Sequence, residues 1–375
     1  MRGSAEDTHW ISDYRFQISN FRFGIEKFCL KHFRQIIQGQ TIRAVLAYTG
    51  RDSFDDLYGD HVKLRNLTVA VLLAGATTFA RAEDRPNYKI LSGDNGHIAI
   101  VNSRGEVEWE VPCHNTPHDI VLLPNGNILG HMSDTKIEEI TPDKKVVWTH
   151  ISKPTEGHKG VQIHAFQRLA NGNTMVSESG NARIIEVDKD DKIVKEFSLT
   201  VEHPSDHSDT RLVRILDNGH YLIAHENDGA VREYDENGKV VWTYKLGLAG
   251  RPAAGGHGPE GHGDHVFSAY RLPNGNTLIG CGNGNRVIEV TPEGKTVWAI
   301  EQKELPGITL AWVTMLEVLP NGNIVIGNCH AGKENPQLFE VTRDKKVVWT
   351  FKDFKNFGNS TAATQILGIE GKVIR

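Results

Sequence analysis

The sequence predicts an all-β protein, a six-bladed β-propeller of four-stranded antiparallel blades. Two observations support this prediction. A motif ending in tryptophan recurs at intervals of roughly fifty residues, and an Asn-Gly pair flanked by alternating apolar residues precedes most of its copies. Four-stranded units of this period are typical of propeller blades, whereas helical repeats are excluded because the units lack helical periodicity.

The tryptophan motif has six copies, in which a turn of small and charged residues leads into two mostly apolar positions and then Trp. Four copies are clear: TPDKKVVW (141–148), DENGKVVW (235–242), TPEGKTVW (291–298) and TRDKKVVW (342–349). Two copies are weaker: NSRGEVEW (102–109) and DKDDKIVK (188–195), where Lys195 takes the Trp position. Six copies predict six blades.

The second marker joins the first two strands of a blade. Its five copies are Asn125-Gly126, Asn171-Gly172, Asn218-Gly219, Asn274-Gly275 and Asn321-Gly322. Asn-Gly is a strong hairpin signal, because both residues accept the positive φ of the tightest turns. We therefore expect each blade to read strand A, Asn-Gly turn, strand B, short connection, strand C, second turn and strand D.

The ring is expected to close through the end of the chain. The first repeat, which begins at Tyr88, lacks strand A and its Asn-Gly turn, and STAATQIL (360–367) has the pattern of the missing strand. Completing blade one in this way would remove the free sheet edges of an open ring. The propeller is therefore predicted to span residues 83–375.

The segment before the propeller has the layout of a secretory signal peptide over residues 62–82. Lys63 and Arg65 precede an apolar run, 67–80, and an Ala-Arg-Ala tripeptide ends at Ala82, the expected cleavage point. The run is too short to span a bilayer. We expect a periplasmic or secreted protein whose mature chain has no membrane span, and we interpret residues 1–61 as an upstream start-site artefact or a disordered extension.

Composition limits the partners and the disulfides. The net charge of −5 and the lack of a Lys/Arg run give no basic surface for nucleic acid, and we expect a monomer. Three cysteines follow residue 82: Cys113, Cys281 and Cys329. An odd number excludes a full disulfide framework. A bridge between Cys281 and Cys329 and free buried thiols both remain open.

Histidines gather on one predicted face. The A-B and C-D turns of an antiparallel blade lie on one side, here termed the lower face, and the B-C and D-A connections lie on the upper face. Thirteen of the fifteen histidines beyond residue 82 fall in upper-face segments. Since strand A lines the axial tunnel, those at its start should meet at the tunnel mouth.

Register identifies the candidate site residues at that mouth. His118 and His164 each precede the Asn of their turn by seven residues, and the equivalent positions in the later blades are Arg211, Phe267 and Thr314. This mixture suits an anionic or aromatic ligand. The catalytic candidates are His118, His164 and Arg211; the ligand-binding candidates are His114, His207, His265, Phe267 and Thr314. The alternative is a structural role, in which the imidazoles bond to backbone groups.

The stretch GGHGPEGHGDH (255–265) lies in the longest D-A connection. Its glycines favour a mobile flap over the mouth, with His265 as its nearest contributor. A metal site formed by His257, His262 and His265 is a weaker interpretation, because zinc and copper accept such ligands but the spacing matches no established motif.

The repeats resemble two known families of propellers. The turn motif is similar to the quinoprotein-type (PQQ-like) repeat of quinoprotein alcohol dehydrogenases, and PHDIVLLPNGN (117–127) resembles bacterial arylsulfotransferases. The first resemblance implies a quinone-dependent oxidoreductase, but the adjacent cysteine pair of those enzymes is missing from this sequence, so we do not expect that cofactor. The second implies that His118 transiently accepts a sulfate group.

Three functions therefore follow from the sequence. The first is binding of a small polar or anionic ligand, or of a protein or glycan, at the upper face. The second is arylsulfotransferase-like group transfer through a tunnel histidine. The third, least favoured, is redox or metal chemistry. Neither the ligand nor a cofactor can be named from the residues alone.

Overall fold

The computed structural model describes residues 33–37, 40–44, 87–114 and 116–375. The chain divides into two units, 1–81 and 82–375. In the first unit, β1 (Phe33–Ile37) and β2 (Gln40–Ala44) pair antiparallel, with Phe33 opposite Ala44. The predicted signal peptide, 62–82, lies outside the described residues, as does most of the predicted extension 1–61.

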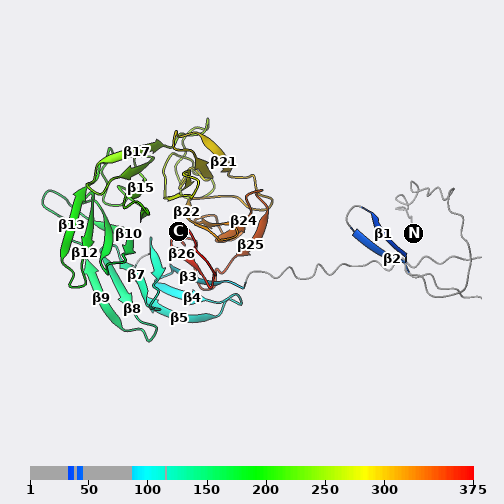
Figure 1. Ribbon diagram of the computed structural model, residues 1–375, viewed down its shortest axis with the longest axis horizontal. Coiled ribbons are helices and arrows are strands. Elements are labelled where there is room, and N and C mark those ends of the chain that lie inside the picture. The colour runs from blue at the N-terminus through cyan, green and yellow to red at the C-terminus, as the bar shows by residue number, and fades with distance from the viewer. Residues whose placement is uncertain (1–32, 38–39, 45–86, 115) are drawn as a thin grey trace, which may run out of the picture. The chain divides into compact units, whose positions relative to one another are not determined.

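The second unit confirms the predicted fold class. Six antiparallel sheets of four strands surround a central axis in chain order (Figure 1), and every element of the described residues is a strand. Blades one and two consist of β26 (Thr364–Leu367), β3 (Lys89–Asp94), β4 (His97–Val101), β5 (Val107–Pro112); and β6 (Ile120–Leu122), β7 (Ile128–Ser133), β8 (Lys136–Ile140), β9 (Val146–Ile151).

The remaining four blades each form from one continuous stretch of chain. Blades three and four consist of β10 (Gln162–Arg168), β11 (Thr174–Ser179), β12 (Arg183–Val187), β13 (Ile193–Ser198); and β14 (Val213–Ile215), β15 (Tyr221–His225), β16 (Ala230–Tyr234), β17 (Val240–Lys245). Blades five and six consist of β18 (Ser268–Arg271), β19 (Thr277–Gly280), β20 (Val287–Val290), β21 (Thr296–Ile300); and β22 (Val313–Val318), β23 (Ile324–Asn328), β24 (Leu338–Val341), β25 (Val347–Phe351).

The ring closes as the sequence predicts. Strand β26 pairs antiparallel with β3, placing Thr364 opposite Ser92 and Leu367 opposite Lys89. The Ser92 hydroxyl donates a hydrogen bond of 2.9 Å to the carbonyl of Ala363. The first and last strands of the propeller therefore belong to one blade (Figure 1).

The Asn-Gly turns form as hairpins, but with a different geometry from the one expected. The Gly126 amide bonds to the Leu123 carbonyl and the Leu123 amide to the Asn127 carbonyl, while Gly126 has φ 84° and Asn125 is not in the left-handed region. This is a type I turn closed by a left-handed glycine, not a turn with two positive φ values. Proline directly before the Asn suits the turn in three blades, since it fixes the φ that the second residue of a type I turn requires, and Ala170 and Asp217 take the same place in blades three and four.

Strand C glutamates tie neighbouring blades together. Glu139 accepts a hydrogen bond of 2.6 Å from the Asn127 amide group of its own turn and an ion pair of 2.7 Å from Arg168 of the next blade. Blade four keeps the pattern with a different residue, because His220 replaces the asparagine and pairs with Glu233 at 2.7 Å. The repeated sequence thus encodes contacts between blades as well as within them.

In five of the six blades, a backbone amide of strand A donates a hydrogen bond to a side chain of the neighbouring blade. Asp119 accepts the amide of Phe166, Gln167 that of Ile215, Tyr270 that of Leu316, Glu317 that of Ile366 and Gln365 that of Leu122. In each pair the accepting side chain comes from the blade immediately before in the ring. Arg214 takes the equivalent position in blade four. Its side chain has no acceptor atom, so it cannot accept an amide of blade five, and it pairs with Asp119 instead.

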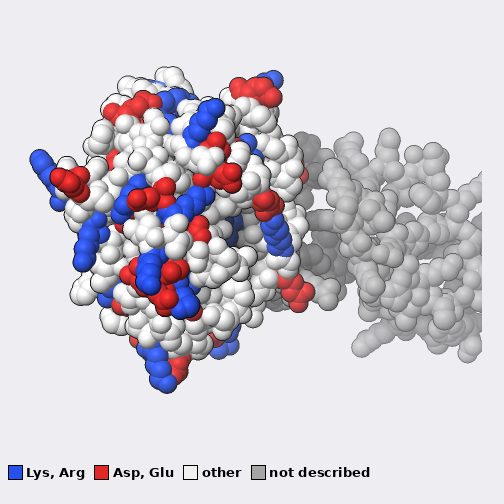
Figure 2. All heavy atoms as spheres, turned by 60° about the vertical axis from the view of Figure 1, so that its left-hand side comes forward, with Lys and Arg blue, Asp and Glu red and all other residues white. Residues whose placement is uncertain are grey.

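Apolar clusters fill the space between the sheets, and charges of both signs mix on the surface. Figure 2 shows Lys and Arg interspersed with Asp and Glu on the face that it presents. Within the described residues, no helix is long and apolar enough to cross a membrane.

Candidate site at the upper mouth of the propeller

Four of the predicted residues meet at the start of strand A. His118 precedes β6, His164 lies in β10, Arg211 precedes β14 and Phe267 precedes β18. The Nη1 atom of Arg211 lies 3.3 Å from Nε2 of His118 and 3.3 Å from Nε2 of His164. The Arg211 guanidinium is 5.7 Å from the centre of the Phe267 ring. We call His118, His164, His207, Arg211 and Phe267 the upper mouth.

His207 joins this group from the D-A connection of blade three. Its ring centre lies 5.9 Å from that of His118 and 5.4 Å from that of His164. Its Nδ1 lies 2.8 Å from the side-chain oxygen of Gln162, which also contacts His164. His207 is exposed whereas His164 is 1% exposed, so the imidazoles extend from the surface into the interior.

Burial keeps the inner imidazoles neutral. It lowers the pKa of both His118 and His164 well below 6.5, with further lowering by Arg211 and, for His118, by His164. The Thr210 carbonyl lies 2.7 Å from Nδ1 of His164 and accepts a hydrogen bond from it, so the proton of the neutral ring is on Nδ1 and Nε2 keeps its lone pair. That lone pair accepts from Arg211.

His118 has the same orientation but lacks the second partner. Its Nε2 faces Arg211, so the proton of the neutral ring is on Nδ1, which is buried without a hydrogen-bond partner in the described residues. A buried donor of this kind is costly unless a ligand or water accepts from it. The upper mouth therefore contains a buried donor without a partner in the described residues, on the side of the His118 ring that points away from Arg211.

Glu226 fixes Arg211 from behind, a contact that register alone did not predict. It forms an ion pair with Nε of Arg211, and both side chains are almost completely buried. Its other oxygen lies 3.8 Å from Nδ1 of His265. The sequence feature that could have identified Glu226 is its position in the B-C connection of blade four, directly after His225.

Trp312 is a second residue that the register argument missed. It packs with Phe267, Cys329 and Ala362 at the axis and has φ 33°, a left-handed conformation that bulky residues rarely adopt. His257 and His265 lie against its ring, with centres 4.3 Å and 6.1 Å away. It is the one Trp beyond residue 82 outside the strand D motif, which could have singled it out.

Two predicted ligand-binding residues are not brought to this cluster. His114 is exposed, and its backbone amide bonds to Met132. Thr314 lies inside β22, where the pairing with β23 shifts between Val313 and Leu316. Its hydroxyl lies against Gly327 of the same blade.

The structure also separates the three histidines of the proposed metal site. His262 is buried, with Nε2 2.8 Å from the Leu248 carbonyl, while His257 lies on Trp312 and His265 faces Glu226. Among the residues that the structure describes, no group of three or more His, Cys, Asp or Glu side chains is arranged to hold a metal ion.

The glycine-rich connection folds back on itself beside the mouth. Ala254 and His262 form an antiparallel bridge, and Gln302 and Asn285 donate hydrogen bonds to the carbonyls of Pro259 and Gly261. These bonds hold the backbone of residues 259–261, and the His257 ring packs against Trp312. His265, at the end of the connection, lies beside Glu226.

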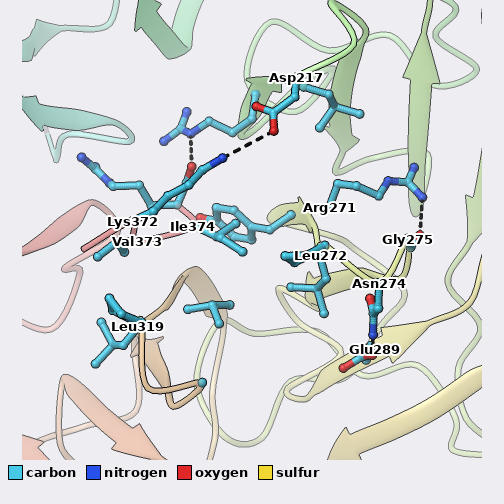
Figure 3. A pocket seen from close by; sticks show the side chains of 18 of the residues that line it. Asp217, Arg271, Leu272, Asn274, Gly275, Glu289, Leu319, Lys372, Val373 and Ile374 are labelled. Carbon is cyan, nitrogen blue, oxygen red and sulfur yellow. Dashed lines mark hydrogen bonds and ion pairs between the residues drawn. The ribbon is translucent and has the colours of Figure 1, made fainter. Parts of the chain in front are cut away.

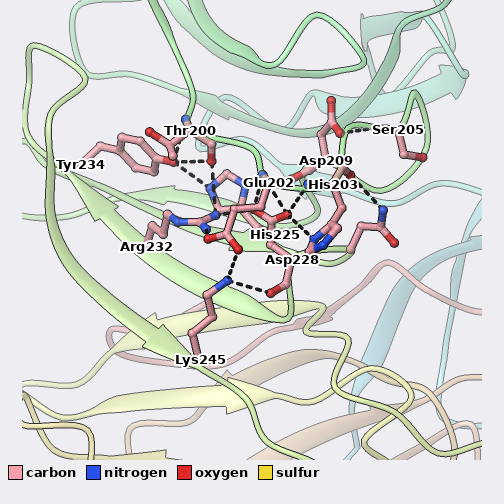
Figure 4. Close-up of polar contacts among 11 residues, drawn as sticks. Thr200, Glu202, His203, Ser205, Asp209, His225, Asp228, Arg232, Tyr234 and Lys245 are labelled. Atoms are coloured by element: carbon pink, nitrogen blue, oxygen red, sulfur yellow. Dashed lines mark hydrogen bonds and ion pairs between the residues drawn. The ribbon is translucent and has the colours of Figure 1, made fainter. Parts of the chain in front are cut away.

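A buried polar network supports the connection that carries Thr210 and Arg211 (Figure 4). His225 donates from Nδ1 to the Asp209 carbonyl at 2.8 Å, and its Nε2 lies 3.0 Å from the hydroxyl of Tyr234. Burial lowers the pKa of His225 to about 3, so this bridge is neutral. It holds the backbone directly before the Thr210 carbonyl that orients His164.

Asp228 anchors the start of the same connection. It accepts the amides of Glu202 and His203 at 3.0 Å and 2.8 Å, and Arg232 at 2.6 Å (Figure 4). Burial would raise the pKa of Asp228, but these hydrogen bonds together lower it. The connection is therefore held at both ends, which keeps Arg211 in place.

Cys281 and Cys329 are buried free thiols, so the disulfide between them that the sequence left open does not form. The Cys329 sulfur lies 2.8 Å from Nδ1 of His330, and burial raises the pKa of its thiol. The neutral thiol therefore donates to the imidazole.

Comparisons with known proteins bear on the fold of this chain. No family model and no curated protein matches the chain. The crystal structure of a protein of unknown function from Bacteroides caccae is 24% identical, with a TM-score of 0.63, and the match covers 76% of this chain and all of that one. Virginiamycin B lyase from Staphylococcus aureus is 14% identical over 78% of this chain and 87% of its own, with a TM-score of 0.46. The likeness to the Bacteroides caccae protein supports the propeller fold.

Proposed function

We propose that the upper mouth binds a small anionic ligand. The observation that supports this most is the placement of Arg211 Nη1 at 3.3 Å from Nε2 of both His118 and His164. The guanidinium supplies the charge, and the unfilled Nδ1 donor of His118 supplies a directed hydrogen bond. Phe267 and Trp312 offer an apolar wall for the organic part of the ligand.

Glu226 sets a limit on the charge of that ligand. Because it pairs with Arg211, the site carries about one positive and one negative charge, surrounded by neutral imidazoles. A monoanion that also uses neutral donors fits this balance better than a dianion does.

Titration calorimetry with benzenesulfonate, and with neutral benzenesulfonamide as its match, tests the proposal. We expect the anion to bind more tightly, and His118→Ala to weaken it about tenfold because a charge-assisted hydrogen bond is lost. The double variant Arg211→Met/Glu226→Gln removes both buried charges and should abolish the preference for the anion. His114→Ala, outside the cluster, is the control; an equal loss there would reject the site.

Group transfer is the second candidate, supported by the lone pair on Nε2 of His118, which Arg211 would have to release before the attack. In this reaction Nε2 of His118 attacks the sulfur of an aryl sulfate, the N–S bond forms, and the S–O bond breaks to release a phenolate. An acceptor phenol then attacks the sulfur, loses its proton to solvent, and returns the N–S electron pair to His118. His164 and Arg211 would stabilise the charge on the transferred group.

A donor assay with 4-nitrophenyl sulfate and phenol distinguishes transfer from binding. Release of 4-nitrophenol that is lost in His118→Ala and His164→Ala, together with a sulfated His118 peptide in mass spectrometry, is the expected result for an enzyme. Turnover unchanged in both variants would rule out the tunnel histidines. Binding without turnover leaves the first proposal in place and removes the second.

Export of the protein is also proposed, on the sequence of residues 62–82. N-terminal sequencing of the mature protein from its native host should begin at Glu83. A mature protein that begins at Met1 would contradict export through this segment.

A further inference from the structure

A cavity of the described residues lies on the lower face, away from the upper mouth. Its volume is about 1210 Å³, and the Asn-Gly turns of blades four, five and six and residues 372–375 enclose it. Figure 3 shows Leu272 and Leu319 on turns facing Val373 and Ile374. We call this space the lower cavity.

The walls of the lower cavity are mainly apolar. Half-buried side chains leave apolar surface open to it, a feature typical of ligand pockets. These side chains are Ile215, Leu216, Leu272, Val318, Val373 and Ile374. Lys372 reaches across to Asp217 at 3.4 Å, and both side chains are exposed, so the ion pair lies at the rim (Figure 3).

Two arginines stand at the inner end of the cavity. Arg214 is satisfied: it donates to both oxygens of Asp119, at 2.8 Å and 3.0 Å, and to the backbone oxygen of Arg375 at 3.1 Å. Arg375 is not. Its Nη2 donates to the Ile120 carbonyl at 2.6 Å, but its buried Nε has no hydrogen-bond partner in the described residues.

The nearest carboxylate does not fill that donor. Glu317 Oε1 lies 4.0 Å from Nε of Arg375, beyond hydrogen-bond distance, and the Glu317 carboxylate accepts the Ile366 amide instead. Burial also raises the pKa of Glu317 to about 7, so its charge is incomplete at neutral pH. Arg375 therefore has one buried guanidinium nitrogen, Nε, without a hydrogen-bond partner in the described residues, at a cavity that it lines together with apolar side chains.

We propose that the lower cavity binds a small amphipathic monocarboxylate, with its carboxylate on Arg375 and its aliphatic part against the six apolar side chains. Guanidinium and carboxylate form paired, charge-assisted hydrogen bonds, and the ligand would fill the vacant Nε donor. A neutral ligand of the same shape would bury the apolar surface but leave that donor unpaired. This site is independent of the upper mouth.

Calorimetry with octanoate and its neutral match octanamide, on the full chain at pH 7.5, tests the proposal. We expect octanoate to bind at least about tenfold more tightly. Arg375→Met should reduce octanoate to the affinity of octanamide. Leu272→Trp, on a turn outside the charged network, should weaken both ligands by filling the cavity, and His118→Ala at the upper mouth should change neither.

Three results would overturn the proposal: no octanoate binding, equal affinity for octanoate and octanamide, or octanoate binding unchanged by Leu272→Trp. If Arg375→Met does not fold, the acid–amide comparison and Leu272→Trp still decide. Loss of octanoate binding in His118→Ala would move the ligand to the upper mouth. Because benzenesulfonate reports on the upper mouth separately, failure at one site is distinguishable from failure at the other.

Discussion

His131 illustrates how burial sets the charge of a single residue in this protein. It is 2% exposed, its Nδ1 accepts the backbone amide of His118 at 3.2 Å, and burial lowers its pKa from 6.5 to about 4. As the pH falls, the unfolded chain therefore binds a proton at His131 before the folded protein does. The contribution of neutral His131 to the stability of the fold is complete above pH 6.5 and is lost as the pH falls toward 4.

We predict that wild type loses about 2 kcal/mol more stability than His131→Gln between pH 7.5 and pH 4.5. The glutamine oxygen can accept the His118 amide, so the hydrogen bond is kept while the titration is removed. Urea denaturation at the two pH values measures the difference. Parallel losses in the two proteins would show that His131 is not buried as a neutral imidazole.

Glu317 gives the opposite pH dependence. Its folded pKa of about 7 lies above the ordinary 4.5, so the unfolded chain releases the proton first and wild-type stability falls as the pH rises from 4.5 through 7. The stability of Glu317→Gln relative to wild type should therefore rise by about 3 kcal/mol between pH 4 and pH 8. A difference that does not vary with pH would contradict this assignment.

At the scale of the element, one glycine conformation defines the A-B hairpins. Gly172 has φ 88°, and an added Cβ would meet nothing within 4 Å, so substitution acts through backbone conformation alone. We predict that Gly172→Ala costs about 1–2 kcal/mol in urea denaturation. Gly247→Ala is the control, because that position is also open but has no left-handed φ, and a similar cost there would contradict the explanation.

At the scale of the whole molecule, closure by β26 makes the ring a single folding unit. Ile366 of β26 is 3% exposed and packs with Leu319, Val325 and Leu338 of blade six. Ile366→Ala should lower the free energy of unfolding by about 2–4 kcal/mol.

Hydrogen exchange tests whether opening begins at blade one. The amides of β3 should exchange faster than those of β11, since β26 covers only blade one. Equal exchange rates across the blades would argue against this order.

The sequence predicted the ring and part of the site for one reason: both follow from the repeat. The repeat period gives the number of blades, and a common register brings His118, His164 and Arg211 to one end of the axis. Register cannot show where a strand is offset, and so Thr314 was expected at the mouth where Trp312 lies instead.

Contacts between segments remote in sequence were the other limit. Glu226 behind Arg211 comes from a connection in the same blade but not from strand A, and nothing in the repeat relates the two. The lower cavity combines three turns with residues 372–375, which lie outside the repeat altogether. Side-chain pairing across such segments depends on packing, which a linear pattern does not record.

The side chains that bridge successive strands A all point the same way around the ring, each serving the blade that follows it. None of these bonds involves a residue of the 246–267 connection, so a cut there leaves all of them in place. A circular permutant that joins residue 375 to residue 87 by a flexible linker and opens at the 246–267 connection would preserve all of them. The propeller is thus a scaffold whose termini can be relocated to present either face to a fused partner.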